Sequence, residues 1–292
     1  MRELSEIFEK YDLVSLNEIS SSEELLNDFL IELSTDLGEL IDSLSRVHNS
    51  ESHPNYYSLN ESTVVGSVVR IIKLFKESVN FYEQNKLELL AQFTRPLYES
   101  FIVAKYLMRN GEDSQRSFRL TSYRARYENF KKLQDHKGDN HPLIQRQLAK
   151  FNTKLEVDAF KLEDLIQESK KKSKAWKLDG KSFWKIHSEV DNEELYSFIY
   201  GGGSDAVHGS WQEILDFHLT RKGEGYFGFL NFEKCDCRIL VPLNSMVIEC
   251  MQEFLAWNST SDKDLKEGLI NMNNLSNAIY DIWENNFGEI IE

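Results

Sequence analysis

Four polar residues have types and spacings that could do chemistry: Arg95, Glu99, Ser204 and His208. Arg95 and Glu99 are four residues apart, so on a helix their side chains share one face. The residues around them are strongly apolar, and a charged pair in such a segment is costly unless the charges meet each other or polar partners. Two interpretations stay open. The pair is either a salt bridge that joins neighbouring helices, or part of a polar pocket in which Arg95 binds an anion and Glu99 orients Arg95.

Tyr200, Ser204 and His208 repeat at the same four-residue spacing. On a helix they would stack on one face, but residues 201–203 are all glycine, and each glycine costs a helix about 1 kcal/mol relative to alanine. Glycines at that cost indicate close approach of the backbone to a ligand or to another helix. Alternatively, they form a loop and Ser204 caps the helix that follows. Because histidine suits proton transfer near neutral pH, His208 is the candidate acid or base.

Two other sequence motifs predict neither a nucleotide-binding loop nor a metal site. The glycines of residues 223–228 match the dinucleotide-binding fingerprint only as letters, because alternating aromatic residues follow them, and we interpret them as a hairpin turn. Cys235 and Cys237 would supply two of the four ligands that a structural zinc site needs, and no second close pair of Cys or His accompanies them. We therefore expect neither a metal nor a cofactor.

Composition limits the class of protein. The chain has 292 residues, of which 41% are hydrophobic and 28% charged, as in globular proteins. Its net charge of −14 repels phosphate backbones and argues against a general nucleic-acid coat, although a local basic groove is compatible with it. Charged residues interrupt the N-terminal segment, so we expect no signal peptide, and no apolar run reaches the ~20 residues of a membrane span. We therefore expect a cytoplasmic protein with no membrane segment.

The elements that must position the candidate residues are mainly helices. Apolar residues at three- and four-residue spacing predict helices at about 21–47, 63–83, 86–109, 114–134, 143–171, 242–257 and 262–287. Pro96 predicts a kink in the helix that carries Arg95, and Asn110-Gly111 predicts its end. The segment 175–190 reads as irregular. The fold class is thus mainly α, a multi-helix bundle with one small β-hairpin insertion near 214–232. We expect the chain to be one helical domain, in which residues 1–60 are an N-terminal extension of a core at 61–292.

Three short motifs resemble an uncharacterised bacterial family of helical proteins, a domain of unknown function: Arg95-Pro-Leu-Tyr-Glu99-Ser, the pair Tyr123 and Tyr127, and Tyr200-x-x-x-Ser204-x-x-x-His208-Gly209. That family is similar to the HEPN superfamily, whose helical bundles often act as metal-independent RNases in toxin–antitoxin and anti-phage systems. HEPN nucleases place an arginine and a histidine close together on one helix, commonly at a dimer interface. This sequence departs from that pattern, because Arg95 and His208 would have to converge from separate helices.

The resemblance implies a transesterification in which the 2′-hydroxyl of RNA attacks the adjacent phosphate. His208 would be the general base or acid, Arg95 would stabilise the phosphorane, Glu99 would orient one of them, and Ser204 or Tyr200 would position a phosphate oxygen. No metal is required for this chemistry.

A basic helix face at 116–132 is either a solvated surface or, in this acidic protein, the place for contacts to phosphate. Tyr123 and Arg124 on this face would bind the substrate together with Tyr200. The implied partners are RNA or a nucleotide, and a second copy of the chain or another subunit of a defence complex. Two alternatives stay open: a non-catalytic regulatory module that binds a nucleotide or anion, and a structural partner subunit in which the polar residues only join helices.

Overall fold

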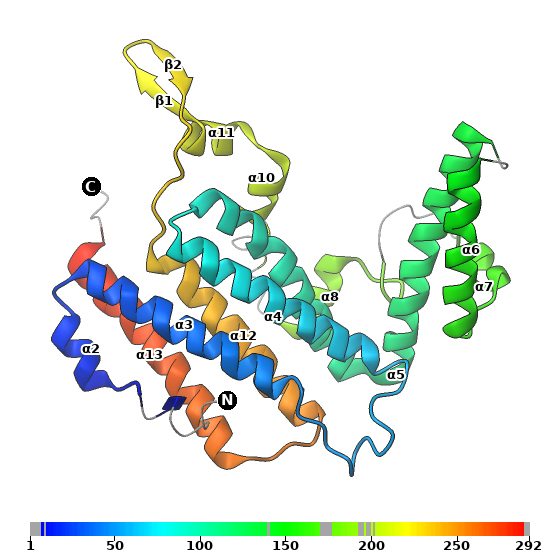
Figure 1. Ribbon diagram of the computed structural model, residues 1–292, viewed down its shortest axis with the longest axis horizontal. Helices are drawn as coiled ribbons and strands as arrows, with labels where there is room; N and C mark the ends of the chain where they lie inside the picture. The colour runs from blue at the N-terminus through cyan, green and yellow to red at the C-terminus, as the bar shows by residue number, and fades with distance from the viewer. Residues whose placement is uncertain are drawn as a thin grey trace. The chain divides into compact units, whose positions relative to one another are not determined.

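The computed structural model describes residues 7–8, 10–138, 141–169, 177–191, 196, 200 and 202–288. Helices dominate these residues, and two short strands form one antiparallel hairpin (Figure 1), which confirms the predicted fold class. The chain forms two compact units: unit 1 comprises Met1–Tyr56, Val65–Lys105 and Asn192–Glu292, and unit 2 comprises Tyr57–Val64 and Tyr106–Asp191. The assignment of the whole chain to one domain stays a prediction.

Three long helices form the core of unit 1: α3 (Glu23–Leu44), α12 (Cys237–Trp257) and α13 (Lys263–Phe287). They pack pairwise against one another, and the short helix α2 (Leu13–Ile19) packs on α3. Helix α3 has ten buried positions and α12 has twelve, and most of them are apolar residues at three- and four-residue spacing. Helix α3, which the sequence places in an N-terminal extension, is therefore part of this core.

A polar contact inside this core joins the three helices. The Asn244 side-chain amide donates to Ser34 Oγ at 2.9 Å and to Ser276 Oγ at 3.0 Å. Helix α12 is also the one described helix that is long and apolar enough to cross a membrane by length and composition alone. Because 61% of its most apolar window is buried within the protein, the packing of α12 against α3 and α13 accounts for that composition.

Two helices pass from one unit into the other: α4 (Ser62–Glu83) and α5 (Leu87–Lys137). Within unit 1 they are joined by a hydrogen bond from Arg70 Nε to Ser100 Oγ at 2.9 Å. Pro96 lies within helical backbone, because Gly111 is the one residue of α5 with non-helical angles, and the kink at Pro96 stays a prediction. The helical angles of α5 break at Gly111 (φ 70°, ψ −159°), where the sequence predicts an end and a second helix follows.

Unit 2 contains the second half of α5 with α6 (Pro142–Val157), α7 (Leu162–Ser169) and α8 (Phe183–Val190). The helix predicted at 143–171 is two helices, because Ala159 takes a left-handed conformation (φ 56°) just after α6. The prediction of an irregular segment at 175–190 is wrong for its second half. The Ser182 side chain accepts a hydrogen bond from Lys185 N and so starts α8.

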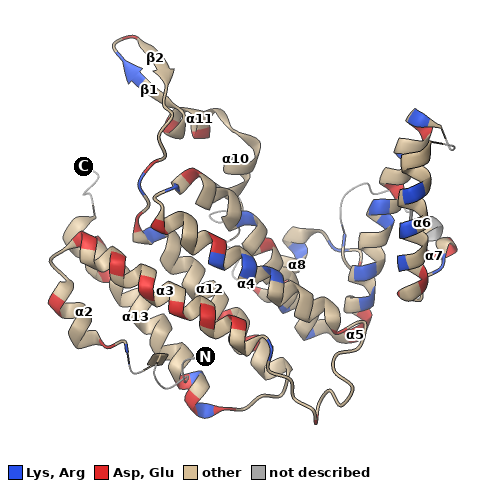
Figure 2. Cartoon of the chain, viewed as in Figure 1, with Lys and Arg blue, Asp and Glu red and all other residues tan. Residues whose placement is uncertain are grey.

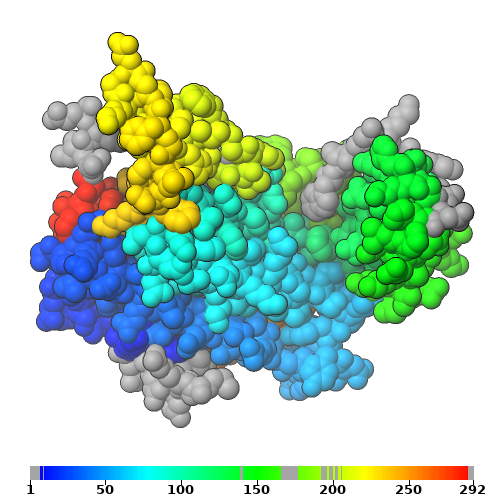
Figure 3. Space-filling view, turned by 45° about the horizontal axis from the view of Figure 1, so that its top comes forward, coloured from blue at the N-terminus to red at the C-terminus, as the bar shows by residue number. Residues whose placement is uncertain are grey.

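The last elements of unit 1 before α12 are α10 (Gly202–His208), α11 (Trp211–Phe217), β1 (Leu219–Lys222) and β2 (Gly225–Gly228). The hairpin is shorter than the predicted span 214–232, because the Ser210 side chain caps α11 and draws residues 211–217 into a helix. A two-residue turn at 223–224 joins the strands, as expected from the glycines. The hairpin protrudes from the surface beside α11 (Figure 3).

Candidate functional site

The guanidinium of Arg95 is the centre of a polar cluster in unit 1. Its Nε donates to Glu99 Oε1 at 3.0 Å, its Nη1 to Ser204 Oγ at 3.0 Å and its Nη2 to the Tyr200 hydroxyl at 2.8 Å. The Arg95 side chain is 18% exposed. The structure therefore brings together four of the predicted site residues, which we call the Arg95 cluster: Arg95, Glu99, Tyr200 and Ser204.

Two tyrosine rings add a stacked layer to the Arg95 cluster. The Arg95 Cζ atom lies 4.3 Å from the centre of the Tyr200 ring, within the range of a cation–π contact. The Tyr196 ring stacks on Tyr200, with centroids 4.7 Å apart and an angle of 14° between the planes. Both tyrosines have π-helical backbone, a conformation that often occurs at functional sites. Tyr196, which the sequence analysis did not single out, continues the four-residue spacing of Tyr200 and Ser204.

The electrostatics of the cluster keep Arg95 charged. Burial by itself lowers the pKa of Arg95, but the hydrogen bond that Arg95 donates to Glu99 and the proximity of Tyr200 outweigh burial and raise that pKa. The Glu99 side chain is 40% exposed and meets the guanidinium from the same helix face, as the four-residue spacing predicts. A guanidinium has five N–H groups and three bonds are made here, so two N–H groups remain for further acceptors.

The packing around Gly203, a residue of α10, requires a glycine at this position. A Cβ atom added to Gly203 would lie 2.7 Å from Arg95 Cβ and 3.3 Å from Arg95 Cα and N. Helix α10 therefore lies directly on the backbone of α5 at Arg95, and only a residue without a side chain fits there. The alternative interpretation, in which the glycines form a loop and Ser204 caps the helix after it, is wrong for the described residues, because α10 already includes Gly202 and Gly203.

His208 is the last residue of α10 and is exposed. It follows Ser204 by four residues on the same helix, so the two lie on one face, about 6 Å apart along the axis. Among the described residues, no hydrogen bond or ion pair joins His208 to Arg95, Glu99 or Ser204. The convergence of Arg95 and His208 on one substrate stays a prediction.

Tyr123 and Arg124, the other predicted substrate-binding residues, lie in unit 2. The Tyr123 hydroxyl donates to the backbone oxygen of Lys154 at 3.2 Å, and its ring packs edge-on against Phe151 and Phe160. Burial, with the nearby Asp158 carboxylate, raises the pKa of Tyr123 to about 12. Tyr123 is therefore a packing residue of unit 2, and its edge lines a surface hollow there.

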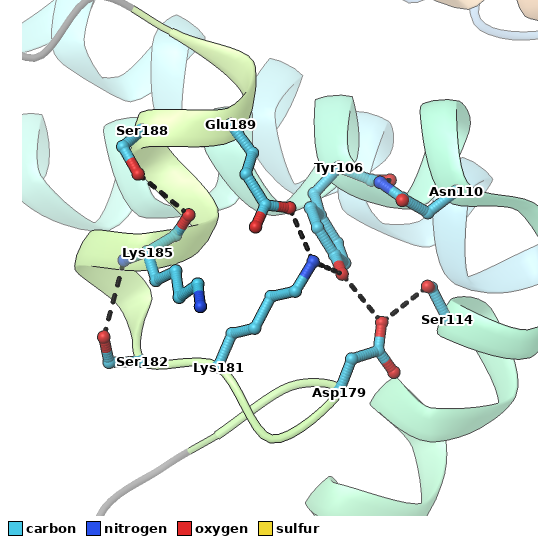
Figure 4. Close-up of polar contacts among 9 residues, drawn as sticks. All are labelled: Tyr106, Asn110, Ser114, Asp179, Lys181, Ser182, Lys185, Ser188 and Glu189. Carbon is cyan, nitrogen blue, oxygen red and sulfur yellow. Dashed lines mark hydrogen bonds and ion pairs between the residues drawn. The ribbon is translucent and has the colours of Figure 1, made fainter.

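A second polar cluster, in unit 2, is centred on the carboxylate of Asp179 (Figure 4). Its Oδ2 accepts from the Tyr106 hydroxyl at 2.9 Å and from Ser114 Oγ at 2.5 Å. The Lys181 ammonium donates to the Tyr106 hydroxyl at 3.1 Å and to Glu189 Oε2 at 2.6 Å. Because Tyr106 precedes the break in α5 at Gly111 and Ser114 follows it, Asp179 bridges the two sides of that break.

The sequence carries one signal for this second cluster. Asp179 and Gly180 both have positive φ (53° and 74°), and the residues on either side of them pair through two backbone hydrogen bonds. This is the tight turn for which Asp-Gly is a favoured pair. Its role in bridging α5 depends on contacts across 65 to 73 residues, which no local pattern contains.

The described residues contain no group of three or more His, Cys, Asp or Glu side chains placed to hold a metal. Cys235 and Cys237 flank Asp236, whose side chain caps α12 by accepting from Arg238 N. These two thiols and that of Cys250 are buried and free, and burial raises the pKa of each to about 12. The cysteine pair is thus part of a helix start.

Comparison with known proteins identifies a family. Residues 61–226 match the model of a Family of unknown function (DUF5677), and this span includes every residue of the Arg95 cluster as well as His208, Tyr123 and Arg124. Searches of curated proteins and of solved structures gave no match.

Proposed function

Since the chain belongs to the family of unknown function DUF5677, we propose its function from the geometry of the site: a metal-independent RNase that acts as a toxin or anti-phage effector. One observation carries this proposal. Helix α10 places Ser204 on the Arg95 guanidinium and exposes His208 one turn further along. Arg95 on α5 thus offers a cation for phosphate, and His208 on α10 offers a side chain for proton transfer.

The proposed reaction is the attack of an RNA 2′-oxygen on the adjacent phosphorus. The new O2′–P bond forms while the P–O5′ bond breaks, the 2′-hydroxyl proton passes to a base, and the 5′-oxygen takes up a proton. His208 exchanges a proton at one of these two oxygens. The two remaining N–H groups of Arg95 meet the phosphorane oxygens, while Glu99 fixes the guanidinium plane and Ser204 or Tyr200 holds a phosphate oxygen.

The test compares purified wild type, His208→Ala and His136→Ala on total bacterial RNA and on a fluorogenic oligoribonucleotide. His136 is an exposed histidine of unit 2 and serves as the matched control. We expect wild type and His136→Ala to cleave RNA equally, and His208→Ala to lose at least about 100-fold in rate with an unchanged circular dichroism spectrum. Cleavage by His208→Ala at the wild-type rate would contradict the assignment of His208.

A second candidate function is favoured by a different observation. Two N–H groups of Arg95 remain for an anion, whereas among the described residues no hydrogen bond or ion pair joins His208 to the Arg95 cluster, so anion binding needs the cluster alone. We propose as the alternative a regulatory module that binds a nucleotide or anion. A ligand that binds only the folded state raises the melting temperature. Stabilisation by nucleoside monophosphates that is lost in Arg95→Lys, without RNA cleavage, would favour this function.

The proposal also includes the location and the oligomeric state of the protein. By the resemblance to HEPN-like proteins, the RNase works in the cytoplasm as a homodimer or as a subunit of a defence complex. If the Arg95 cluster only joins helices, as in a structural partner subunit, Arg95→Lys lowers stability and changes neither ligand binding nor cleavage. Light scattering after size-exclusion chromatography measures the oligomeric state directly.

A further inference from the structure

Two adjoining hollows lie along the surface between the second half of α5 and α6, entirely within unit 2. Their volumes are about 310 Å³ and about 580 Å³, each in the range of a small-molecule site. Arg126 of α5 and Lys154 of α6 line both hollows. The hollows are therefore consecutive parts of one surface depression, which we call the α5/α6 groove.

The groove is basic in a chain that is acidic overall. Residues 114–158 contain ten Lys and Arg against five Asp and Glu, while the whole chain has a net charge of −14. Figure 2 shows these cations along the end of α5 and along α6. Among the described residues, no ion pair neutralises the exposed Arg126, Lys150 or Lys154. The single acid in the walls, Asp158, lies 3.6 Å from Arg119.

Aromatic rings line both hollows beside these cations. Phe118 and Tyr123 are in the walls of the smaller hollow, and Phe130 and Phe151 are in the walls of the larger one. Phe130, Tyr123 and Phe118 are only partly buried, so part of each is open to solvent. A simple phosphate or sulfate ion would need the cations but not the rings. Cations that alternate with aromatic rings along a groove are the arrangement that holds a single nucleic-acid strand.

We infer that the α5/α6 groove binds single-stranded nucleic acid. Arg126 and Lys154 contact backbone phosphates at the junction of the two hollows, and one base enters each hollow, against Tyr123 on one side and Phe130 on the other. All of these residues lie in unit 2, so strand binding does not depend on cleavage at the Arg95 cluster.

The test measures fluorescence anisotropy of fluorescein-labelled oligouridylate and oligothymidylate of about ten nucleotides. The full chain carries His208→Ala throughout, so that any cleavage is suppressed and binding is read alone. Arg126→Gln/Lys154→Gln removes the two shared cations. The matched control, Lys161→Gln/Lys185→Gln, removes two exposed cations of unit 2 that do not line the groove. Circular dichroism and melting curves establish that every variant is folded.

We expect at least one of the two oligonucleotides to bind, with an affinity that falls as the salt concentration rises. In Arg126→Gln/Lys154→Gln only, the negative slope of log K against log salt should become less steep by about 1.4. Phe130→Leu, which keeps the charge, should weaken strand binding at least about fivefold while leaving the binding of heparin unchanged. Absence of strand binding at low salt, equal losses in the control pair, or equal effects of Phe130→Leu on heparin would each overturn the inference. So would a preference for double-stranded RNA.

Discussion

At the scale of single residues, Arg95 and Gly203 depend on each other. The guanidinium reaches Ser204 and Tyr200 because α10 comes close to α5, and α10 comes close because residue 203 has no side chain. Two hydrogen bonds and one cation–π contact thus rest on the absence of a single methyl group.

Gly203→Ala should therefore lower the free energy of unfolding by about 1–3 kcal/mol, because the added methyl overlaps Arg95 Cβ and pushes α10 away from α5. Urea denaturation followed by circular dichroism measures this change. The control is Gly66→Ala, at an exposed helical position of α4 with no atom within 4 Å of the added carbon. That control should be neutral or gain up to about 1 kcal/mol. Equal stability of the two variants would show that the close contact at Gly203 is unimportant.

The sequence predicts contacts at this scale only where they are local. Arg95 and Glu99 share a helix, so their spacing alone indicates the pair. Ser204 and Tyr200 share a helical spacing with each other, but their meeting with Arg95 spans more than 100 residues. That contact depends on how α10 crosses α5. The glycine run was the one hint of it, and the same run was equally consistent with a loop.

At the scale of elements, the break in α5 at Gly111 is held by a side chain from elsewhere in unit 2. Burial by itself raises the pKa of Asp179, but hydrogen bonds from Ser114, Ser117 and Tyr106 outweigh burial and lower it. A carboxyl with a lowered pKa in the folded state adds stability above its unfolded pKa, and this contribution is lost as the pH falls through the folded pKa.

Asp179→Asn should cost about 1–3 kcal/mol at neutral pH, because hydrogen bonds to a charged acceptor are replaced by weaker ones. The difference from wild type should begin to shrink as the pH falls below the unfolded pKa of about 4, where the unfolded chain takes up a proton, and should be lost as the pH falls through the lowered folded pKa. Urea denaturation across a pH series measures both effects. Asp135→Asn, at an exposed position of α5 in the same unit, serves as the control for a simple charge change. A constant difference between Asp179→Asn and wild type down to pH 3 would contradict the bridge.

Periodicity predicted the long helices of the bundle, but not where short elements begin. Ala159 divides a segment that reads as one helix, because a left-handed residue is not visible in apolar spacing. Helix α8 is only eight residues long and starts at the Ser182 cap, so its apolar residues gave no clear period. In the same way, Ser210 caps α11, so residues 214–217, which the sequence places in the hairpin, are helical.

At the scale of the whole molecule, the cysteines and the basic segment lie in different units. The three cysteines are at positions 235, 237 and 250, all in unit 1. The basic segment 114–158 is in unit 2. The composition of the full chain averages these features, so the net charge of −14 gave no indication of a basic groove.

The native protein should react slowly with a thiol reagent at pH 8, because burial raises the pKa of all three thiols to about 12 and shields them. In urea, pulsed labelling read by mass spectrometry should follow the unfolding of unit 1 and be insensitive to Asp179→Asn, which acts in unit 2. Rapid labelling of the native chain at several sites would contradict the packing around α12.

The contact between Gly203 and Arg95 also has a consequence for the evolution of the family. Both positions lie within the span that matches the family. In relatives that keep an arginine at position 95, selection should retain glycine at position 203, whereas relatives that have lost the arginine are free to acquire a larger residue there. The two positions should therefore be inherited as a pair, and their joint presence would mark the branch of the family that has kept the site.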